Sequence, residues 1–445
     1  MYKTIYRTIY ALLAASLLLI SVPGCSSLED DFQPDPFYPS GGATSDRTVS
    51  DESRDIFILW SLGFNNLSSY LKEDLNDIAS NWLPVKGRNK DMVLAFCHNT
   101  AGAYSVQTSP VLIQLYKDFN GLTHRDTLMV LPKETISASA ETMHEVLSYI
   151  KERFPAKGYS MLVSSHGTGW VPEGYCNNPS SFENTKYSLR RTRREPVPYV
   201  EIPAEEGMPL TKSIGCQNIS SKQVYEMNIT DMAEAIPMHL DYLIFDACFM
   251  GGVEVAYELR EKCDRMIFSQ TEILADGMDY ATMLSYLMEE ETPDLVGYCE
   301  NYFNYYNNQS GAYKSATISL VDCTRLDQLA EACSDIFESR RSEIAALEGK
   351  STIQRYYRSG LTQHSWFFDL ESIISSCGAA EYQVRKVEDA LEGCIIYKAA
   401  TAEFMQSFAI NTHSGLSMYL PYRNRNYLNS FYKVLKWNKD TGLIK

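Results

Sequence analysis

Short apolar runs alternate with segments of helical spacing from about residue 55 onward. Runs of four to eight residues rich in Ile, Val, Leu, Phe and Tyr are typical of buried strands. They are IFILWSL (56–62), MVLAF (92–96), TLMVL (127–131), YSMLVSS (159–165), YLIF (242–245), RMIFS (265–269) and KSATISLV (314–321). Helical spacing separates several of them, as in SYLKEDLNDIA, ETMHEVLSYIKERF, ITDMAEAIP and VEVAYELREKC. Strands alternating with helices predict an α/β sandwich with a mostly parallel sheet.

Two departures from this rhythm suggest the domain organisation. We predict a core over residues 52–330 and a mainly helical extension over residues 331–445 that packs on it and ends in an apolar strand and a helix. Residues 177–221 show no sustained periodicity, which predicts a long loop inserted in the core. This loop carries a cluster of basic side chains in an acidic protein. The cluster consists of Lys186, Arg190, Arg191, Arg193 and Arg194.

The first 24 residues predict a signal peptide. Lys3 and Arg7 precede an apolar stretch, residues 9–22, that is too short to span a bilayer comfortably. The sequence VPGC that ends at Cys25 resembles a bacterial lipobox, which implies cleavage before Cys25 and lipidation of its sulfur. The alternative is an ordinary signal peptide followed by a chance cysteine. Residues 25–51 are rich in Pro, Ser, Asp and Gly and predict a flexible tether.

These features predict where the protein resides and which partners it meets. The acidic run SSLEDDF after Cys25 is similar to the export signals of some surface lipoproteins. We therefore expect an exported lipoprotein at the outer membrane or cell surface of a Gram-negative-type bacterium, held to the membrane by the Cys25 lipid. The formal net charge of −16 argues against nucleic acid as a partner.

The eleven cysteines argue against a metal-binding or disulfide-rich framework. Apart from Cys25 and Cys248, nine remain, an odd number at irregular spacings without a CxxC pair. We expect most of them to be small buried hydrophobic residues, with one or two disulfides left open.

Two of the predicted strands end in reactive residues. One ends in His166-Gly167 and another in Asp246-Ala247-Cys248. If the two strands are parallel neighbours, the imidazole and the thiol emerge at one edge of the sheet. A helix predicted to begin near Met250 would favour the thiolate. The imidazole could then take the thiol proton and later protonate a leaving amine, while backbone N–H groups of Gly167 and Cys248 receive an oxyanion.

Each of these residues also has a simpler interpretation. A cysteine at a strand end is commonly a packed hydrophobe, and a lone histidine is commonly a satisfied polar residue. Asp246 could cap the following helix. A serine nucleophile at Ser164 or Ser165 is not favoured, because the chain has no G-x-S-x-G motif.

The two strand ends are similar to the signature blocks of one family. SHGTGW (165–170) and DACFMGGVEVAYEL (246–259) resemble those of clostripain-like cysteine peptidases, relatives of caspases and gingipains. LGFNNLSSYLKEDL, SQTEILADGMDY and SGLSMYLPYRNRNY resemble further family segments. The resemblance implies a caspase-like three-layer α/β/α fold. It also implies that His166 is the catalytic histidine, that Cys248 is the nucleophile, and that the N–H groups of Gly167 and Cys248 form the oxyanion hole.

The resemblance also implies a substrate class and a maturation step. Asp246 matches an acid that lines the pocket for the residue before the cut, so we expect protein or peptide substrates with Arg or Lys there. The family tends to mature by cutting itself between its histidine and cysteine, which points to the basic cluster at 186–194; the alternative is a solvated basic surface patch. No cofactor is required. Calcium, which some members need, has no spaced acidic loop here, so a metal stays unknown. The competing hypothesis is an anchored peptide- or glycan-binding protein on an inactive protease scaffold.

Overall fold

The computed structural model describes residues 54–88, 90–101, 106–184, 196–198, 208, 217–220, 223–357 and 365–445. The predicted signal peptide, the tether with Cys25, and the basic cluster from Lys186 to Arg194 lie outside the described residues.

A ten-stranded sheet forms the centre of the fold, with strand order β14-β12-β11-β10-β6-β1-β2-β4-β5 and the short β3 (Val106–Gln107) beside β2. The five central strands are parallel: β2 (Met92–Ala101), β1 (Asp55–Gly63), β6 (Gly158–Ser164), β10 (Leu240–Asp246) and β11 (Cys263–Phe268). Antiparallel strands flank them, namely β4 (Val111–Lys117) and β5 (Thr123–Val130) at one edge, and β12 (Thr317–Asp322) and β14 (Ile395–Ala400) at the other. The predicted α/β fold with a mostly parallel sheet is confirmed.

The central strands are mostly apolar because helices cover both of their faces. Every residue of β6 is buried, and so is β10 apart from Asp241. Near-continuous apolar runs, rather than alternating ones, are expected for parallel strands covered on both sides. This is why YSMLVSS and YLIF were recognisable as strands from the sequence.

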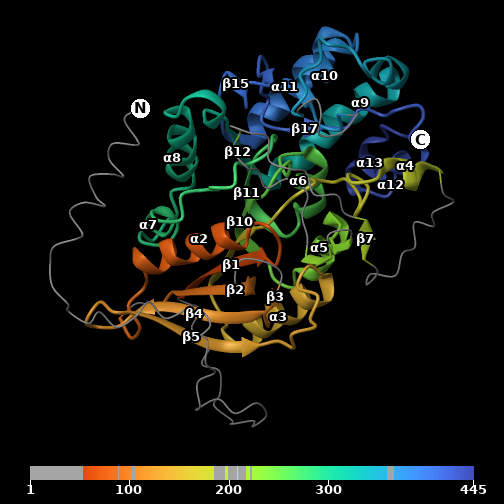
Figure 1. Ribbon diagram of the computed structural model, residues 1–445. Helices are drawn as coiled ribbons and strands as arrows, with labels where there is room; N and C mark the ends of the chain where they lie inside the picture. Colours follow the sequence, from red (N-terminus) through yellow and green to blue (C-terminus); the bar gives the residue numbers. More distant parts are fainter. Residues whose placement is uncertain are drawn as a thin grey trace.

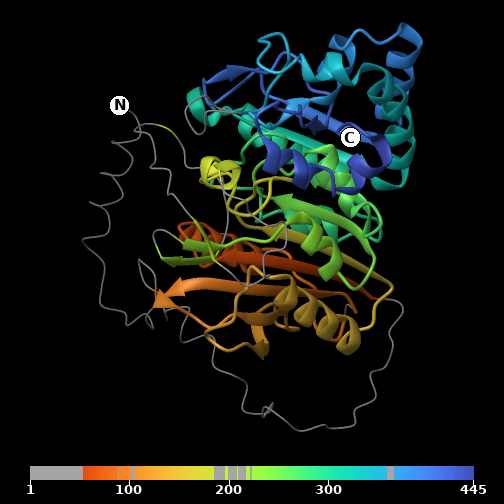
Figure 2. The same cartoon turned by 90° about the vertical axis from the view of Figure 1, so that its right-hand side faces the viewer.

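Helices form an outer layer on each side of the sheet, as Figures 1 and 2 show. On the side that we call the α8 face lie α2 (Ser68–Ser80), α7 (Met283–Leu287) and α8 (Leu295–Asn307). On the other side, the α5 face, α3 (Ala140–Arg153) packs on α5 (Ile229–Ala235), and α5 packs on α6 (Val253–Leu259). None of the described helices is long and apolar enough to cross a membrane.

The C-terminal region is continuous with the core. The boundary predicted at residue 330 falls inside α9 (Leu326–Ala345), and β14 extends the central sheet beyond β12. The remaining C-terminal elements are β13 (Phe368–Asp369), α10 (Leu370–Ser376), α11 (Glu381–Cys394), β15 (Glu403–Phe404), β16 (Phe408–Ala409), β17 (Ser417–Met418), α12 (Asn426–Tyr432) and α13 (Lys436–Thr441). Helices α9 and α13 pack on α6, which follows the predicted nucleophile.

Part of the segment predicted as a long inserted loop has regular structure. Its described residues form helix α4 (Pro179–Asn184) and strands β7 (Val197–Pro198) and β8 (Gln217–Ser220). These two strands flank β9 (Gln223–Tyr225) in a small antiparallel sheet of their own.

The nine cysteines that the structure describes are all buried, with free thiols. Cys263 and Cys323 come closest, with their sulfur atoms 3.7 Å apart. The expectation that most cysteines are small buried hydrophobic residues is confirmed for these positions.

Glu254 joins α6 to the C-terminal region. Its side chain is fully buried, and its Oε1 accepts hydrogen bonds from the Tyr419 N–H at 2.8 Å and the Tyr432 hydroxyl at 2.9 Å. Burial raises the pKa of Glu254 from 4.5 to about 7, although the hydrogen bonds it accepts act in the opposite direction.

This raised pKa predicts a pH-dependent stability. The folded protein holds the Glu254 proton between pH 4.5 and about 7, where the unfolded chain has released it, so the wild type loses stability as pH rises through that window. Glu254→Gln removes the loss. The free energy of unfolding of the variant relative to wild type should therefore rise by up to about 3 kcal/mol across the window, as measured by urea unfolding. Glu392→Gln, an exposed position on α11, is the matched control. Parallel pH profiles for Glu254→Gln and wild type would contradict this account.

Candidate active site

His166 and Cys248 lie at the same edge of the sheet, the one formed by the carboxyl ends of the parallel strands. β6 and β10 are parallel neighbours, and Ser164 pairs with Asp246. His166 and Cys248 each lie two residues beyond this pair. The contact continues beyond the strands. A Cβ atom on Gly167 would lie only 2.6 Å from the Cys248 carbonyl oxygen and 3.1 Å from its nitrogen. The strand arrangement on which the sequence prediction depended is thus confirmed.

The glycines of the SHGTGW block are explained by close backbone contacts. Gly167 can have no side chain because the Cys248 backbone occupies that space. Gly169 has φ of +60°, and a Cβ atom there would lie 2.6 Å from the Phe249 carbonyl oxygen. Both glycines allow the segment after His166 to lie directly against the segment after Asp246.

Cys248 is fully buried and interacts with the segment that follows β11. Its Sγ accepts a hydrogen bond from the Ile273 N–H at 3.1 Å. The prediction that a helix begins near Met250 is wrong, because α6 starts at Val253, with Gly252 as its N-cap. The effect of a helix dipole falls off within the first turn, and α6 begins five residues after Cys248. The sulfur instead contacts the backbone of Ile273, whose carbonyl oxygen lies 3.6 Å away.

The backbone after Cys248 is strained and anchored. Phe249 has φ of +61°, a left-handed conformation that costs a non-glycine residue roughly 1–3 kcal/mol. Its N–H donates to the Thr271 carbonyl at 2.9 Å, and the Gly251 N–H donates to the Ser269 carbonyl at 2.7 Å. The Phe249 ring stacks on Phe367 with centroids 4.7 Å apart. These contacts hold the turn that follows the Cys248 thiol.

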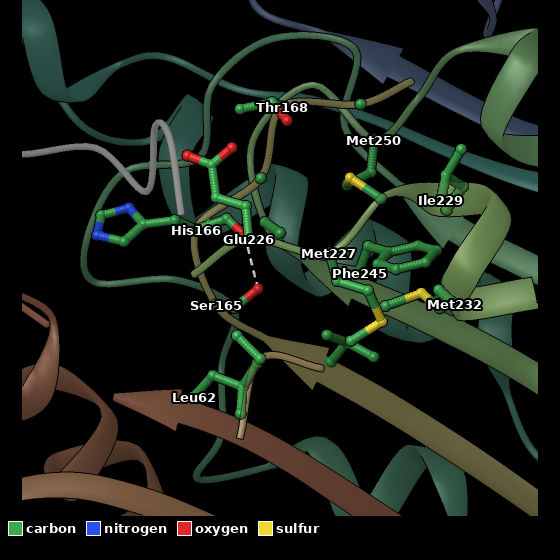
Figure 3. Close-up of a pocket in the computed structure, with 15 residues that line it drawn as sticks. Leu62, Ser165, His166, Thr168, Glu226, Met227, Ile229, Met232, Phe245 and Met250 are labelled. Atoms are coloured by element: carbon green, nitrogen blue, oxygen red, sulfur yellow. Dashed lines mark hydrogen bonds between the residues drawn. The ribbon is translucent and has the colours of Figure 1, made fainter. Parts of the chain in front are cut away.

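Asn66 positions the imidazole, and the sequence analysis did not single it out. It lies in the loop between β1 and α2, and its Oδ1 is 2.7 Å from His166 Nε2. A carboxamide oxygen only accepts hydrogen bonds, so Nε2 carries the hydrogen and Nδ1 is the basic nitrogen of the neutral ring. Figure 3 shows the imidazole directed away from the apolar pocket that its own backbone helps to line. The only sequence signal was the position of Asn66 in the LGFNNLSS block.

Asp246 lies on the α8 face, fully buried. Its Oδ2 accepts hydrogen bonds from the Ser164 hydroxyl at 3.2 Å and from the Tyr280 hydroxyl. Burial and the nearby Asp246 charge raise the pKa of Tyr280 well above its ordinary value, so the phenol stays a donor. Asp246 therefore has no contact with solvent in this structure. Its carboxylate is held by the hydroxyl groups of Ser164 and Tyr280.

Tyr280 lines a cavity of about 370 Å³ between α2, α8 and the segment after β11. This acidic cavity has no lysine or arginine in its lining. Burial, together with the Asp276 charge, raises the pKa of Tyr70 and of Tyr305 at its wall. The carboxylates of its lining are Glu73, Asp74, Asp77, Asp276 and Asp279.

The sequence analysis missed this cavity, although Asp276 and Asp279 lie in the quoted SQTEILADGMDY segment. The three acids of α2 come from a separate part of the chain, and only the fold brings them there. Among the described residues, no three His, Cys, Asp or Glu side chains are grouped so as to hold a metal ion.

The sequence profile of the clostripain family, peptidase family C11, matches residues 204–442, which is more than half of the chain. No curated protein matches the sequence.

Solved structures of this class share the fold. The X-ray structure of an inactive zymogen C11 protease from Parabacteroides distasonis has a TM-score of 0.67 and 26% identity, and the match covers 87% of this chain and 97% of that one. A secreted C11 cysteine protease from Bacteroides thetaiotaomicron, iotapain, has a TM-score of 0.66 and 24% identity, covering 87% and 99%. A secreted C11 cysteine protease of the same organism in complex with an irreversible peptide inhibitor has a TM-score of 0.66 and 22% identity, with the same coverage.

The contact between Asn66 and His166 predicts a positioning effect. Asn66→Ala should lower kcat for peptide hydrolysis about tenfold with little change in KM, because the imidazole loses part of its orientation. Asn66 is exposed, so the melting temperature should stay unchanged. Ser69→Ala, an exposed position on the adjacent α2, is the control. A variant with wild-type kcat would show that Asn66 does not position the ring.

Proposed function

Because the chain belongs to the clostripain family of cysteine proteases, we propose that His166 and Cys248 are its catalytic dyad and that it cleaves peptide bonds after Arg or Lys. The observation that carries the dyad is the contact between the two strand ends, where Gly167 lies against the Cys248 backbone. This contact supports the proposal that the His166 imidazole and the Cys248 thiol act on the same peptide bond.

The proposed reaction proceeds in two steps and needs no cofactor. His166 takes the proton of the Cys248 thiol, and the sulfur attacks the carbonyl carbon of the substrate. The resulting oxyanion accepts hydrogen bonds from the N–H groups of Gly167 and Cys248. The C–N bond breaks as His166 protonates the leaving amine, and a thioester remains. Water that gives a proton to His166 then hydrolyses the thioester, releasing the acid and restoring the thiol.

The acidic cavity supports the preference for Arg or Lys. Five carboxylates surround it without a basic side chain in the lining, so a cationic side chain would satisfy charges that otherwise repel one another. Asp276 is exposed at this cavity, whereas Asp246 is fully buried behind Tyr280. We propose that Asp276 pairs directly with the substrate cation and that Asp246 forms the charged floor below Tyr280.

We also propose that the protein matures by cleavage within residues 186–194 and that it is exported to the outer membrane or cell surface. Cleavage within 186–194 would use the enzyme's own preference, since the cluster offers basic residues at five positions. One similar structure is described as an inactive zymogen and another as a secreted protease, which is consistent with a precursor form and with export. Attachment to the outer membrane or cell surface would follow from lipidation of Cys25. The hypothesis of an inactive binding scaffold is disfavoured, because the chain retains His166, Gly167 and Cys248.

Cys248→Ala tests the nucleophile. Loss of the sulfur should lower hydrolysis of an Arg-containing reporter peptide by about 10⁴-fold or more, because no covalent intermediate can form. Cys97→Ala, a buried thiol on β2, which β1 and β6 separate from β10, is the matched control and should keep measurable activity. Mass spectrometry of both proteins would also show whether a cut in 186–194 depends on Cys248. Retained hydrolysis in Cys248→Ala would overturn the proposed nucleophile.

Asp276→Asn tests the cation site. The charge-assisted hydrogen bond to substrate should weaken, lowering kcat/KM for Arg peptides about ten- to a hundredfold. The low activity on a matched Gln peptide should change little, since Gln carries no charge to pair. Asp264→Asn, at the opposite end of β11, is the control for loss of one negative charge. Equal losses for Arg and Gln peptides would assign Asp276 a structural role instead.

A further inference from the structure

A second pocket borders the proposed catalytic edge on the α5 face. Its volume is about 70 Å³, and Figure 3 shows several of its side chains converging from β6, β10, α5 and the turn after Cys248. Most of its lining is apolar. The principal apolar residues are Leu62, Val163, Met227, Ile229, Met232, Phe245 and Met250. His166, Gly167 and Thr168 form part of the same lining, to which His166 contributes its backbone, and Glu226 adds a carboxylate.

The alternation of side chains along β10 separates this pocket from the acidic cavity. Asp246 points to the α8 face, where it accepts a hydrogen bond from Tyr280, whereas Phe245 and Ala247 line the pocket on the α5 face. β6 shows the same division, since Ser164 contacts Asp246 while Val163 and Ser165 line the pocket. Two pockets of different chemistry therefore flank the proposed dyad on opposite sides of the sheet.

An extended substrate peptide has the same alternation. Successive side chains of an extended chain point to opposite sides, so a basic residue in the acidic cavity directs the next residue toward the α5 face. The His166 backbone borders the apolar pocket, and the His166 imidazole must protonate the amine on that side of the cut bond. We propose that this pocket binds the side chain of the residue immediately after the cut, and that it selects an aliphatic side chain no larger than that of Leu or Met. The inference rests on the proposed function.

Volume and polarity define which side chains the pocket accepts. An apolar cavity of about 150 Å³ can bind benzene, and this pocket has about half that volume, so we expect it to disfavour aromatic rings. An acidic side chain would be desolvated among methionines and Phe245 and would face the Glu226 carboxylate of the lining, so it would bind poorly. Glycine would leave the pocket without an apolar contact. Aliphatic side chains gain burial, and the flexible thioethers of Met227, Met232 and Met250 can adapt to their shapes.

The inference also distinguishes among the candidate processing bonds. The residues that follow the five basic positions are Tyr187, Arg191, Thr192, Arg194 and Glu195. Only Thr192 has the size of an accepted aliphatic side chain, and an apolar pocket rejects an added hydroxyl only weakly. Self-cleavage should therefore occur chiefly between Arg191 and Thr192.

The test uses full-length enzyme and internally quenched peptides that carry Arg before the cut. The residue after the cut is varied among Gly, Val, Leu, Met, Phe and Asp, with the remainder of the peptide constant. The value of kcat/KM for Leu should exceed that for Gly, Phe or Asp about tenfold or more. Met232→Ala, on α5, should enlarge the pocket and raise the Phe-to-Leu ratio of kcat/KM by about tenfold. This ratio is internal to each preparation, so a partly unfolded variant does not distort it.

Glu234→Ala is the matched control, because Glu234 is exposed on the same helix and is not part of the pocket lining. It should keep the wild-type ratio. Equal cleavage of all six peptides, or a Met232→Ala variant with the wild-type Phe-to-Leu ratio, would overturn the inference while leaving the proposed function intact. A wild-type enzyme that cuts none of the Arg peptides would overturn both.

Discussion

The close approach of Gly167 to the Cys248 backbone is the constraint on which the proposed site depends. Parallel pairing of β6 and β10 brings the two strand ends level, and the missing side chain lets the following segments touch. A larger residue at 167 would have to displace the Cys248 carbonyl or the Gly167 backbone, moving the two proposed oxyanion donors apart. The turn after Cys248 tolerates a left-handed Phe249 because hydrogen bonds from Phe249 to Thr271 and from Gly251 to Ser269 hold it in place.

Successive side chains of a strand point to opposite faces of the sheet, and this alternation places two different pockets on the two sides of the contact between Gly167 and Cys248. Asp246 and Ser164 point to the α8 face, and their neighbours Phe245, Ala247 and Val163 point to the α5 face. A single pair of strands therefore supports an acidic cavity on one side and an apolar pocket on the other. Each pocket is completed by elements of its own layer, α2 and α8 for the first and α5 for the second. Loops or helices of one layer can thus change without disturbing the pocket on the opposite face.

The sequence predicted those parts of the protein that are encoded locally. Buried parallel strands such as 159–165 were recognisable from continuous apolar runs, and the reactive residues at the ends of two strands indicated a shared site. Several elements were missed, among them β4, and two of them have a clear physical reason. Helix α8 is rich in Tyr and Phe, residues typical of strands, and β14 is a half-exposed edge strand that follows α11 directly with no turn residue between. Asn66 and the acids of α2 could not be assigned to the site, because only tertiary structure brings them to it.

The C-terminal region supports the site and is not a separate addition to it. Trp170, which ends the histidine block, is buried against Tyr419 and Tyr432, with ring centroids 4.7 and 4.9 Å away. The same two residues donate hydrogen bonds to Glu254 on α6, the helix that follows the nucleophile. One cluster of C-terminal aromatic residues therefore contacts the segments after both His166 and Cys248. Since these two segments are otherwise joined mainly by glycine-mediated backbone contacts, the C-terminal region supplies the side-chain packing that keeps their spacing constant.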